Sequence, residues 1–335
     1  YKRQALAAFV GTLLMAVLAN YPFALAPGMG LNAYFAYTVV IGMGYSWEYA
    51  LTAVFAEGII FILLSVTNVR EAIFNAIPKN LKSAVSVGIG LFIAFVGLQN
   101  AHIVMGGATL VELFSLDGYN KLNGVNATMN DVGITVLLAI IGILITGWLV
   151  VKNVKGNILW GILITWAIGI VCQFAGIYVP NAEVGCFSLL PDFSHGLSIP
   201  SIAPIFCKLQ FKGIFTLDFV VILCAFLFVD LFDTIGTLVG VSSKAGMLDK
   251  EGKLPKIKGA LLADALATTA GAVLGTSTTT TFVESASGVS EGGRTGLTAV
   301  TTAILFGLAL FLSPIFLAIP SFATAPALSL IHISE

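Results

Sequence analysis

Long apolar runs alternate with short polar stretches along most of the chain. A helix needs about 20 apolar residues to cross a bilayer. Eight uninterrupted runs come near that length, namely Ala5–Leu18, Tyr49–Val66, Ala84–Leu98, Val132–Val150, Ile158–Tyr178, Leu217–Val241, Gly259–Leu274 and Leu297–Ile319. The pattern therefore predicts eight membrane-spanning helices.

Two further apolar stretches are interrupted. Phe23–Tyr45 is broken by Ala-Pro-Gly-Met-Gly, and Gly275–Ser290 is broken by Thr-Ser-Thr-Thr-Thr-Thr. They raise the predicted number of membrane segments to ten, and an eleventh begins near Ser321. Non-helical backbone survives at membrane depth only where it is buried in protein or lines a cavity. Paired interrupted segments in the two halves of a chain thus indicate the binding site of a secondary transporter.

The two interruptions differ in chemistry. Pro27, Gly28 and Gly30 remove one backbone donor and two side chains, which lets the main chain turn and approach a ligand closely. The hydroxyls and β-branched side chains of Thr276–Thr281 favour an extended strand. Each interruption precedes a helix-compatible stretch, so each is expected to place a helix N-terminus near the bilayer centre.

Composition supports a membrane protein. Hydrophobic residues make up 58% of the chain and charged residues 10%, and the mean hydropathy is +0.99. A soluble domain carries about 25% charged residues. The net charge of -1 carries no information about nucleic acid, and no basic stripe suggests nucleic acid as a partner.

Loop charges predict the orientation, because short cytoplasmic loops collect Lys and Arg. The loops at 69–83, which contains Arg70, at 151–156 and at 242–258 are basic and are expected inside. The longer loops at 99–131 and 180–216 are expected outside.

The four cysteines show no metal-binding spacing. They are interpreted as small apolar residues, and a loop disulfide between Cys186 and Cys207 is the alternative.

Two carboxylates lie in the apolar run FLFVDLFDTIG. Asp230 and Asp233 are one helical turn apart and project from one face of the helix predicted over Leu217–Val241. Ionisable groups at this depth face the bundle interior, and that helix contains no Lys or Arg to neutralise them. We expect at least one of the two carboxyls to gain and lose a proton near neutral pH, as a proton-coupled carrier requires.

Other polar residues lie at similar depth. Glu284 follows the Thr run and Asn32 follows the Gly pair, and together with the Asp pair they suit a small planar heterocycle better than a metal. Glu57 is interpreted as a helix–helix contact, with a functional acid as the alternative. Asp264 is expected near the inner interface.

Several long motifs carry a resemblance to a known family. ALAPGMGLNAYFAYTVV, GIGLFIAFVGLQNA, FVDLFDTIGTLVGVSSKAGMLDKEGKLPKIKGALLADA and GTSTTTTFVESASGVSEGGRTGLTAV resemble the adenine/guanine/hypoxanthine permeases of the nucleobase:cation symporter 2 family. The likeness runs from about Leu18 to Leu328.

The resemblance implies an all-α polytopic fold of fourteen segments in two inverted repeats of seven, with core and gate domains. The third and tenth segments each contain a short strand and a half helix, matching the two interruptions. Residues 1–328 form one transporter domain in this frame, with core segments at about 19–66 and 217–319 and gate segments at about 82–178. Segment 1 and most of segments 12–14 are then expected to be missing, and 329–335 to be a foreign or misread tail.

The resemblance also implies roles for residues. Asp233 and Glu284 match the acids that meet the base in related uracil and urate/xanthine carriers, and Phe282 and Val283 border the base. Asn32 and Asp230 match polar positions of the purine branch. Asp230, Asp233 and Glu284 are the expected proton-coupling groups. Uracil carriers have histidines where this chain has Thr234 and Thr237, which makes uracil a less favoured substrate.

The sequence therefore predicts a plasma (inner) membrane importer of hypoxanthine, guanine or adenine, driven by proton symport. No cofactor is expected beyond the coupling proton, and the expected partners are the base, the lipid bilayer and a second copy in a homodimer. Open alternatives are a xanthine/urate or uracil carrier, a sulfate-type anion carrier, and a membrane-embedded enzyme that uses Asp230 and Asp233 with a metal.

Overall fold

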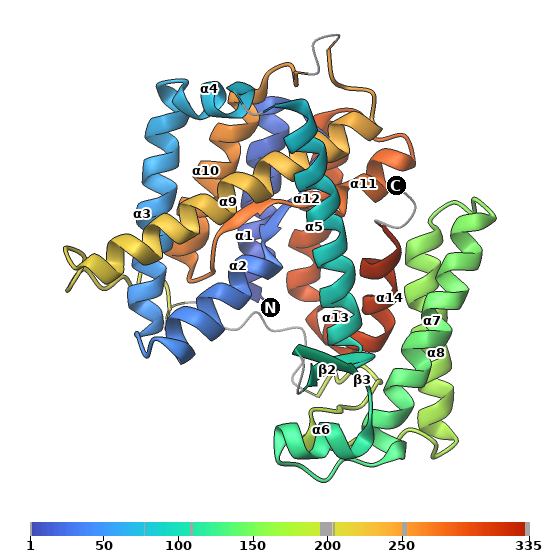
Figure 1. Cartoon of the computed structure of the whole chain (residues 1–335). Coiled ribbons are helices and arrows are strands. Elements are labelled where there is room, and N and C mark those ends of the chain that lie inside the picture. Colours follow the sequence, from blue (N-terminus) through green and yellow to red (C-terminus); the bar gives the residue numbers. More distant parts are fainter. Residues whose placement is uncertain are drawn as a thin grey trace. The chain divides into compact units, whose positions relative to one another are not determined.

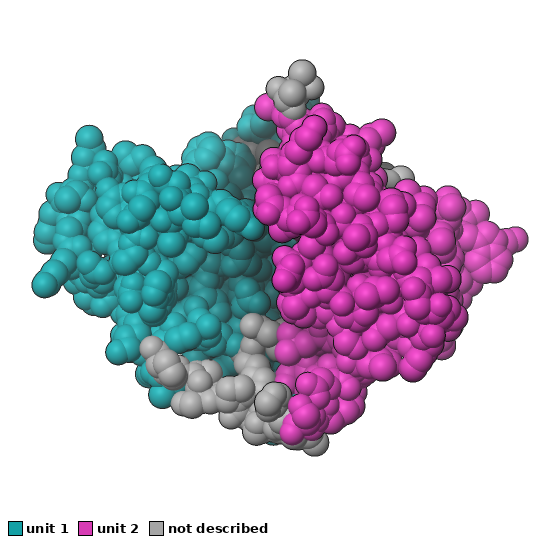
Figure 2. Space-filling view, turned by 90° about the horizontal axis from the view of Figure 1, so that it is seen from below, with its two compact units in different colours: residues 1–87, 198–311 teal, residues 88–197, 312–335 magenta. Residues whose placement is uncertain are grey.

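The computed structural model describes residues 2–76, 78–107, 110–194, 203, 205–249 and 253–331. Two compact units make up the chain. Unit 1 comprises Tyr1–Val87 and Ser198–Phe311, and unit 2 comprises Gly88–Leu197 and Leu312–Glu335. Figure 2 colours unit 1 teal and unit 2 magenta. Both interrupted segments belong to unit 1.

Helices dominate both units, as Figure 1 shows. In unit 1 the elements are α1 (Lys2–Ala19), β1 (Leu25–Pro27), α2 (Met29–Ala33), the π-helix η1 (Tyr34–Gly42), α3 (Trp47–Val66), α4 (Val69–Ala76), α9 (Leu217–Lys244), α10 (Ile257–Leu274), β4 (Thr279–Thr281), α11 (Ser285–Ser290) and α12 (Gly296–Phe311). Helix α5 (Lys79–Asn100) runs from unit 1 into unit 2. Unit 2 adds β2 (Val104–Gly107), β3 (Leu110–Leu113), α6 (Leu116–Asn123), η2 (Met129–Gly133), α7 (Ile134–Val151), α8 (Asn157–Phe174), η3 (Ala182–Val184), α13 (Ser313–Ala318) and α14 (Ser321–Ile331).

Length and hydropathy identify the helices that can span a membrane. Among the described residues, five are long and apolar enough: Trp47–Val66, Met129–Val151, Asn157–Phe174, Leu217–Ser243 and Ile257–Leu274. Four shorter apolar helices are Arg3–Ala19, Met29–Gly42, Gly90–Asn100 and Gly296–Phe311. Every predicted span thus contains an apolar helix, although α1, α5 and α12 contribute shorter apolar stretches than the other five.

Two predicted helix ends were wrong. The span predicted over Leu297–Ile319 is two helices, because α12 ends at Phe311 and Pro314 lies in the first turn of α13. Proline cannot donate the backbone hydrogen bond of a helix interior but fits a first turn. The span predicted to reach Tyr178 ends at Phe174, and Gly176 adopts a left-handed conformation just beyond it (φ 71°).

The core of unit 1 is built on close helix contacts. Helix α10 packs against both α1 and α3, and α4 packs against α3 and α10. Gly58 of α3 lies directly against Thr269 of α10, and a Cβ at this position would collide with the Thr269 side chain and backbone. Small residues at such contacts let helix backbones approach one another in a membrane. This close contact fixes the position of α3 relative to α10, and both helices contribute side chains to the interrupted segments.

The interrupted segments pair with each other. Strands β1 and β4 are antiparallel, with Leu25 opposite Thr281 and Pro27 opposite Thr279. The pairing continues beyond the strands, since Gly28 N donates to Thr278 O at 3.1 Å and Phe282 N donates to Ala24 O at 2.8 Å. The short strands predicted in both segments are confirmed, although only the second half of the Thr run is a regular strand.

In unit 2, α7 packs against α8 and α14 packs against both. The hairpin of β2 and β3 forms part of the predicted outer loop at 99–131, where no strand was predicted. All four cysteines are free thiols, so the alternative disulfide between Cys186 and Cys207 is wrong. Helix α14 continues through the first residues of the predicted foreign tail, and residues 332–335 lie outside the described residues.

Candidate functional site

The backbone of the strand pair is satisfied by side chains from neighbouring helices. Thr12 of α1 both accepts from Leu25 N (2.9 Å) and donates to Leu25 O (3.1 Å). Thr268 of α10 donates to Thr279 O at 2.9 Å, and Ser285 Oγ accepts from Ala24 N at 2.9 Å. Each unpaired backbone group in hydrocarbon costs several kcal/mol. These hydroxyls therefore allow a two-stranded sheet to exist inside the helical unit.

Asn32 links the two interrupted segments. Its side-chain oxygen accepts a short hydrogen bond from Ser277 Oγ, just before β4. Its amide nitrogen donates to Pro27 O at 3.4 Å. The side chain is partly exposed, so it can also offer hydrogen-bonding groups to a ligand.

Asp233 and Glu284 lie around the same strand pair. A Cβ placed on Gly28 would be 3.5 Å from Asp233 Oδ2 and 3.1 Å from Thr280 Cγ2, so the carboxylate of α9 reaches the turn after β1. Glu284 is the residue before α11, three positions after β4. Both acids are partly exposed, as a ligand-binding group must be.

Phe282 and Val283 connect β4 to Glu284. Phe282 is partly exposed, Val283 is buried at 9% exposure, and the Phe282 backbone N–H is already bound by Ala24. The structure thus brings Asn32, Asp233, Phe282, Val283 and Glu284 to one strand pair. Their contact with a base stays a prediction.

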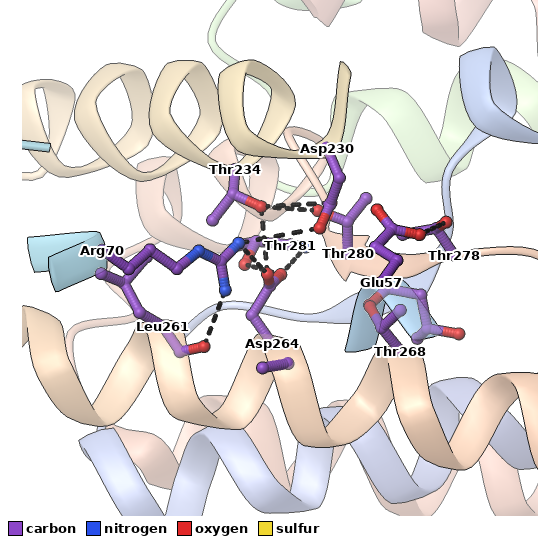
Figure 3. A network of polar contacts seen from close by, with 12 residues as sticks. Glu57, Arg70, Asp230, Thr234, Leu261, Asp264, Thr268, Thr278, Thr280 and Thr281 are labelled. Carbon is purple, nitrogen blue, oxygen red and sulfur yellow. Dashed lines mark hydrogen bonds and ion pairs between the residues drawn. The ribbon is translucent and has the colours of Figure 1, made fainter. Parts of the chain in front are cut away.

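A fully buried polar network adjoins strand β4 and is shown in Figure 3. Arg70 of α4 donates from Nη2 to Asp264 Oδ2 at 2.8 Å and from Nη1 to Leu261 O at 2.9 Å. The same Nη2 lies 3.7 Å from Asp230 Oδ2. Thr234 lies between the two acids, 3.1 Å from Asp264 Oδ2 and 3.4 Å from Asp230 Oδ1. One arginine therefore faces two aspartates from different helices.

One expectation is corrected by this network. Arg70 is not an exposed charge of an inner loop, since it is 0% exposed and its guanidinium stacks on the Phe61 ring at 3.9 Å from the centroid. Asp264, expected near the inner interface, is 0% exposed inside unit 1, where Thr281 N donates to it at 3.1 Å. The helix of Asp230 contains no Lys or Arg, as predicted, and the cation near Asp230 comes from another helix.

Glu57 belongs to this buried group as well. It is 0% exposed, and Thr278 Oγ1 donates to its Oε2 at 2.8 Å, while Oε1 has no hydrogen-bond partner among the described residues. The acid therefore contacts the second interrupted segment and not merely a neighbouring helix. The alternative role of Glu57, a functional acid, stays a prediction.

A signal for Arg70 was present in the sequence. The eight uninterrupted predicted spans contain Glu57, Asp218, Asp230, Asp233 and Asp264 but no Lys or Arg. Buried charges in membranes pair with one another, so a cation must come from a flanking segment. Arg70 lies only four positions beyond the span that ends at Val66, within reach of the buried acids once α4 folds back.

Comparisons with known proteins agree with this architecture. Residues 3–333 match the permease family. The chain belongs to this family. It is 44% identical to the guanine/hypoxanthine permease PbuG of Bacillus subtilis over 98% of this chain and 68% of that protein. It is 37% identical to the adenine permease AdeP of Escherichia coli over 96% of this chain and 66% of that protein. The chain thus spans about two thirds of the length of these relatives.

A solved structure shows the same fold. The transmembrane domain of a cyanobacterial bicarbonate transporter, BicA, superposes with a TM-score of 0.64 and 15% identity, covering 98% of this chain and 79% of that one. The predicted inverted-repeat transporter fold and the predicted family are therefore confirmed. This permease is a multi-pass membrane protein, and membership of a transporter family favours a carrier over the membrane-embedded enzyme.

Proposed function

We propose that this permease imports purine nucleobases such as hypoxanthine, guanine and adenine, and that protons drive the import. The observation that carries the proposal is the meeting of Asp233, Glu284 and the Asn32 amide at the β1–β4 pair. The names of its relatives, guanine/hypoxanthine permease and adenine permease, support purines over other solutes.

The groups at the strand pair fit the edges of a neutral purine. Carboxylates accept hydrogen bonds from ring N–H and amino groups, and an amide can both donate and accept. The Phe282 ring offers an apolar surface, and aromatic rings stack on bases at a gain of about 1–3 kcal/mol per base. In this proposal Glu284 and Asp233 bind the donor edges of the purine and Asn32 binds an acceptor.

The test of the substrate is uptake of labelled hypoxanthine by cells that express the full-length protein. We expect unlabelled guanine and adenine to compete, and uracil and sulfate to compete poorly. Glu284→Gln keeps the shape of the side chain but replaces one acceptor with a donor, and it should abolish saturable uptake. Asp218→Asn is the matched control, because it makes the same acid-to-amide change away from the strand pair. Asp218 lies in the first turn of α9, well before Asp233, and accepts a hydrogen bond from Tyr45 OH at 2.6 Å. Uptake unaffected by purines would refute the proposal.

The coupling ion is tested separately. A carboxylate in a membrane interior costs several kcal/mol unless it is compensated, and protonation relieves that cost. Substrate and proton affinities must then be linked reciprocally. Uptake should rise as the external pH falls from about 7.5 to about 6, and a protonophore should abolish accumulation at constant sodium. Uptake that follows the sodium gradient and ignores the protonophore would contradict proton symport and leave the purine site standing.

A further inference from the structure

We infer that Arg70 is a positioning residue of the transport site, although it lies on α4 and touches none of the predicted base-binding side chains. It holds Asp264, which in turn holds the strand that leads to Glu284, and it supplies the positive charge that faces Asp230. The inference rests on the proposed function, because it assigns to Arg70 the placement of the acids at the strand pair.

The first step is the anchoring of Arg70 itself. Its guanidinium is fully buried, donates to the Leu261 carbonyl and to Asp264, and lies over the Phe61 ring. These contacts come from α10 and α3, so two neighbouring helices fix the plane of the group. A planar guanidinium can satisfy such divergent acceptors at once, whereas a lysine ammonium is a point charge on a flexible stem.

The second step links Asp264 to the strand. Its Oδ2 is bound by Arg70, while its Oδ1 accepts from Thr281 N at 3.1 Å and lies 3.4 Å from Thr281 Oγ1. Thr281 is the last residue of β4, and Glu284 follows three positions later. A side chain that binds the last strand N–H fixes where the chain leaves the sheet. Arg70 thereby orients the acid at the start of α11.

The third step concerns charge. Arg70 Nη2 lies 2.8 Å from Asp264 Oδ2 of α10 and 3.7 Å from Asp230 Oδ2 of α9. Glu57 of α3 is fully buried in the same network, and Asp233 adds a further carboxylate one turn from Asp230. Among the described residues of this group Arg70 is the cation, and the acids outnumber it. Removing it leaves buried acids without their cation, so the pH dependence of uptake should change, which loss of a purely structural clamp would not cause.

The test uses four variants of the full-length protein: Arg70→Gln, Arg70→Lys, Asp264→Asn and the double variant Arg70→Gln/Asp264→Asn. The matched control is Arg294→Gln, because Arg294 also donates to backbone carbonyls in unit 1, those of Val289 and Gly293, but is exposed. Purified protein is assayed for hypoxanthine binding and thermal stability. Hypoxanthine uptake is measured between about pH 5.5 and about pH 8.

We expect Arg70→Gln to weaken hypoxanthine binding about tenfold or more, as small displacements of a binding group do, and to change the pH profile of uptake. Arg70→Lys should keep the position of the pH profile but bind hypoxanthine more weakly than the wild type. The double variant should recover part of the thermal stability lost in Arg70→Gln, because removing one partner of a buried pair is worse than removing both.

Two outcomes would overturn the inference. One is binding and a pH profile equal to the wild type in every variant. The other is loss of thermal stability alone, with folded Arg70→Lys and double-variant protein that bind hypoxanthine normally and keep the wild-type pH profile. The proposed function fails separately, since in that case the wild type and Arg294→Gln would themselves show no purine-competed uptake.

Discussion

In unit 2 the buried hydroxyls of Thr146 and Thr165 donate to carbonyls of their own helices, Gly142 O at 2.7 Å and Gly161 O at 2.8 Å. In unit 1 the buried hydroxyls of Thr268 and Thr278 donate to other elements, β4 and α3. The bonds of unit 2 survive any small shift between α7 and α8. Those of unit 1 exist only while α3, α10 and β4 keep their arrangement.

The difference separates a packing role from a chemical one. Helices α7 and α8 pack closely at two positions, where a glycine of one helix contacts a threonine of the other. Gly142 faces Thr165, and Gly161 faces Thr146. This contact is held by close packing, which is the usual way helices associate in lipid. Unit 1 instead joins its elements through a network in which each polar group depends on the others. Such a network defines positions for acids to a fraction of an ångström, which a binding site needs and a packing contact does not.

The largest expected effect tests whether that network carries binding. Asp233→Asn should weaken hypoxanthine binding about 100-fold or more, because it leaves a substrate donor facing an amide donor. Asp230→Asn should reduce uptake more than binding, since Asp230 faces Arg70 and Thr234 and is fully buried. Equilibrium binding and initial uptake rates measured on the same preparations separate the two effects. An equal loss of binding in both variants would remove the distinction between them.

The sequence predicted those features of unit 1 that are local. Pro27 and Gly28 cannot continue a helix, a run of threonines favours extended backbone, and Asp230 and Asp233 lie on one helical face whatever surrounds them. The fold and the family followed from long motifs. The pairing of β1 with β4 was not predicted. It joins residues about 250 positions apart, and local propensity holds no information about such distant contacts.

Arg70 and Asp264 could not be placed by the same reasoning. Loop position and the clustering of basic residues indicated a cytoplasmic charge, which describes exposed lysines well. Burial of Arg70 depends on α4 packing against α3 and α10, a tertiary contact with no local signature. The break between α12 and α13 differs, because Pro314 is a local signal for a helix break within the predicted span of Leu297–Ile319.

A second prediction tests the packing role of unit 2. Gly161→Ala should lower the stability of the protein by about 1–3 kcal/mol, because the new Cβ would lie 2.9 Å from Thr146 Cβ and Cγ2. Thr146→Ala in the same chain should restore part of the loss, because it removes Oγ1 and Cγ2 but leaves the Cβ of residue 146 at 2.9 Å from the new Cβ. Thermal unfolding of detergent-solubilised protein measures both variants. Hypoxanthine affinity should stay within about twofold of the wild type, since distant, independent sites behave additively. A large affinity change would mean that the two units are not specialised as described.

The smallest expected effect compares one hydroxyl from each unit directly. Thr278→Val and Thr146→Val are the same nearly isosteric change, and both side chains are buried at 0% and 1% exposure. Thr278→Val should cost about 1–2 kcal/mol of stability, because Glu57 would lose the hydrogen bond to Oε2, and Oε1 has no partner in the part of the chain that the structure describes.

Thr146→Val should change the stability by no more than about 0.5 kcal/mol. The carbonyl it releases, that of Gly142, still belongs to the backbone ladder of α7, and threonine bonds of this kind contribute little to a helix. Thermal unfolding at matched detergent and pH gives the two values side by side. Equal losses would show that the hydroxyls of unit 1 are as local in their effect as those of unit 2, and that the strand pair is held by its backbone and apolar contacts rather than by the network around Glu57.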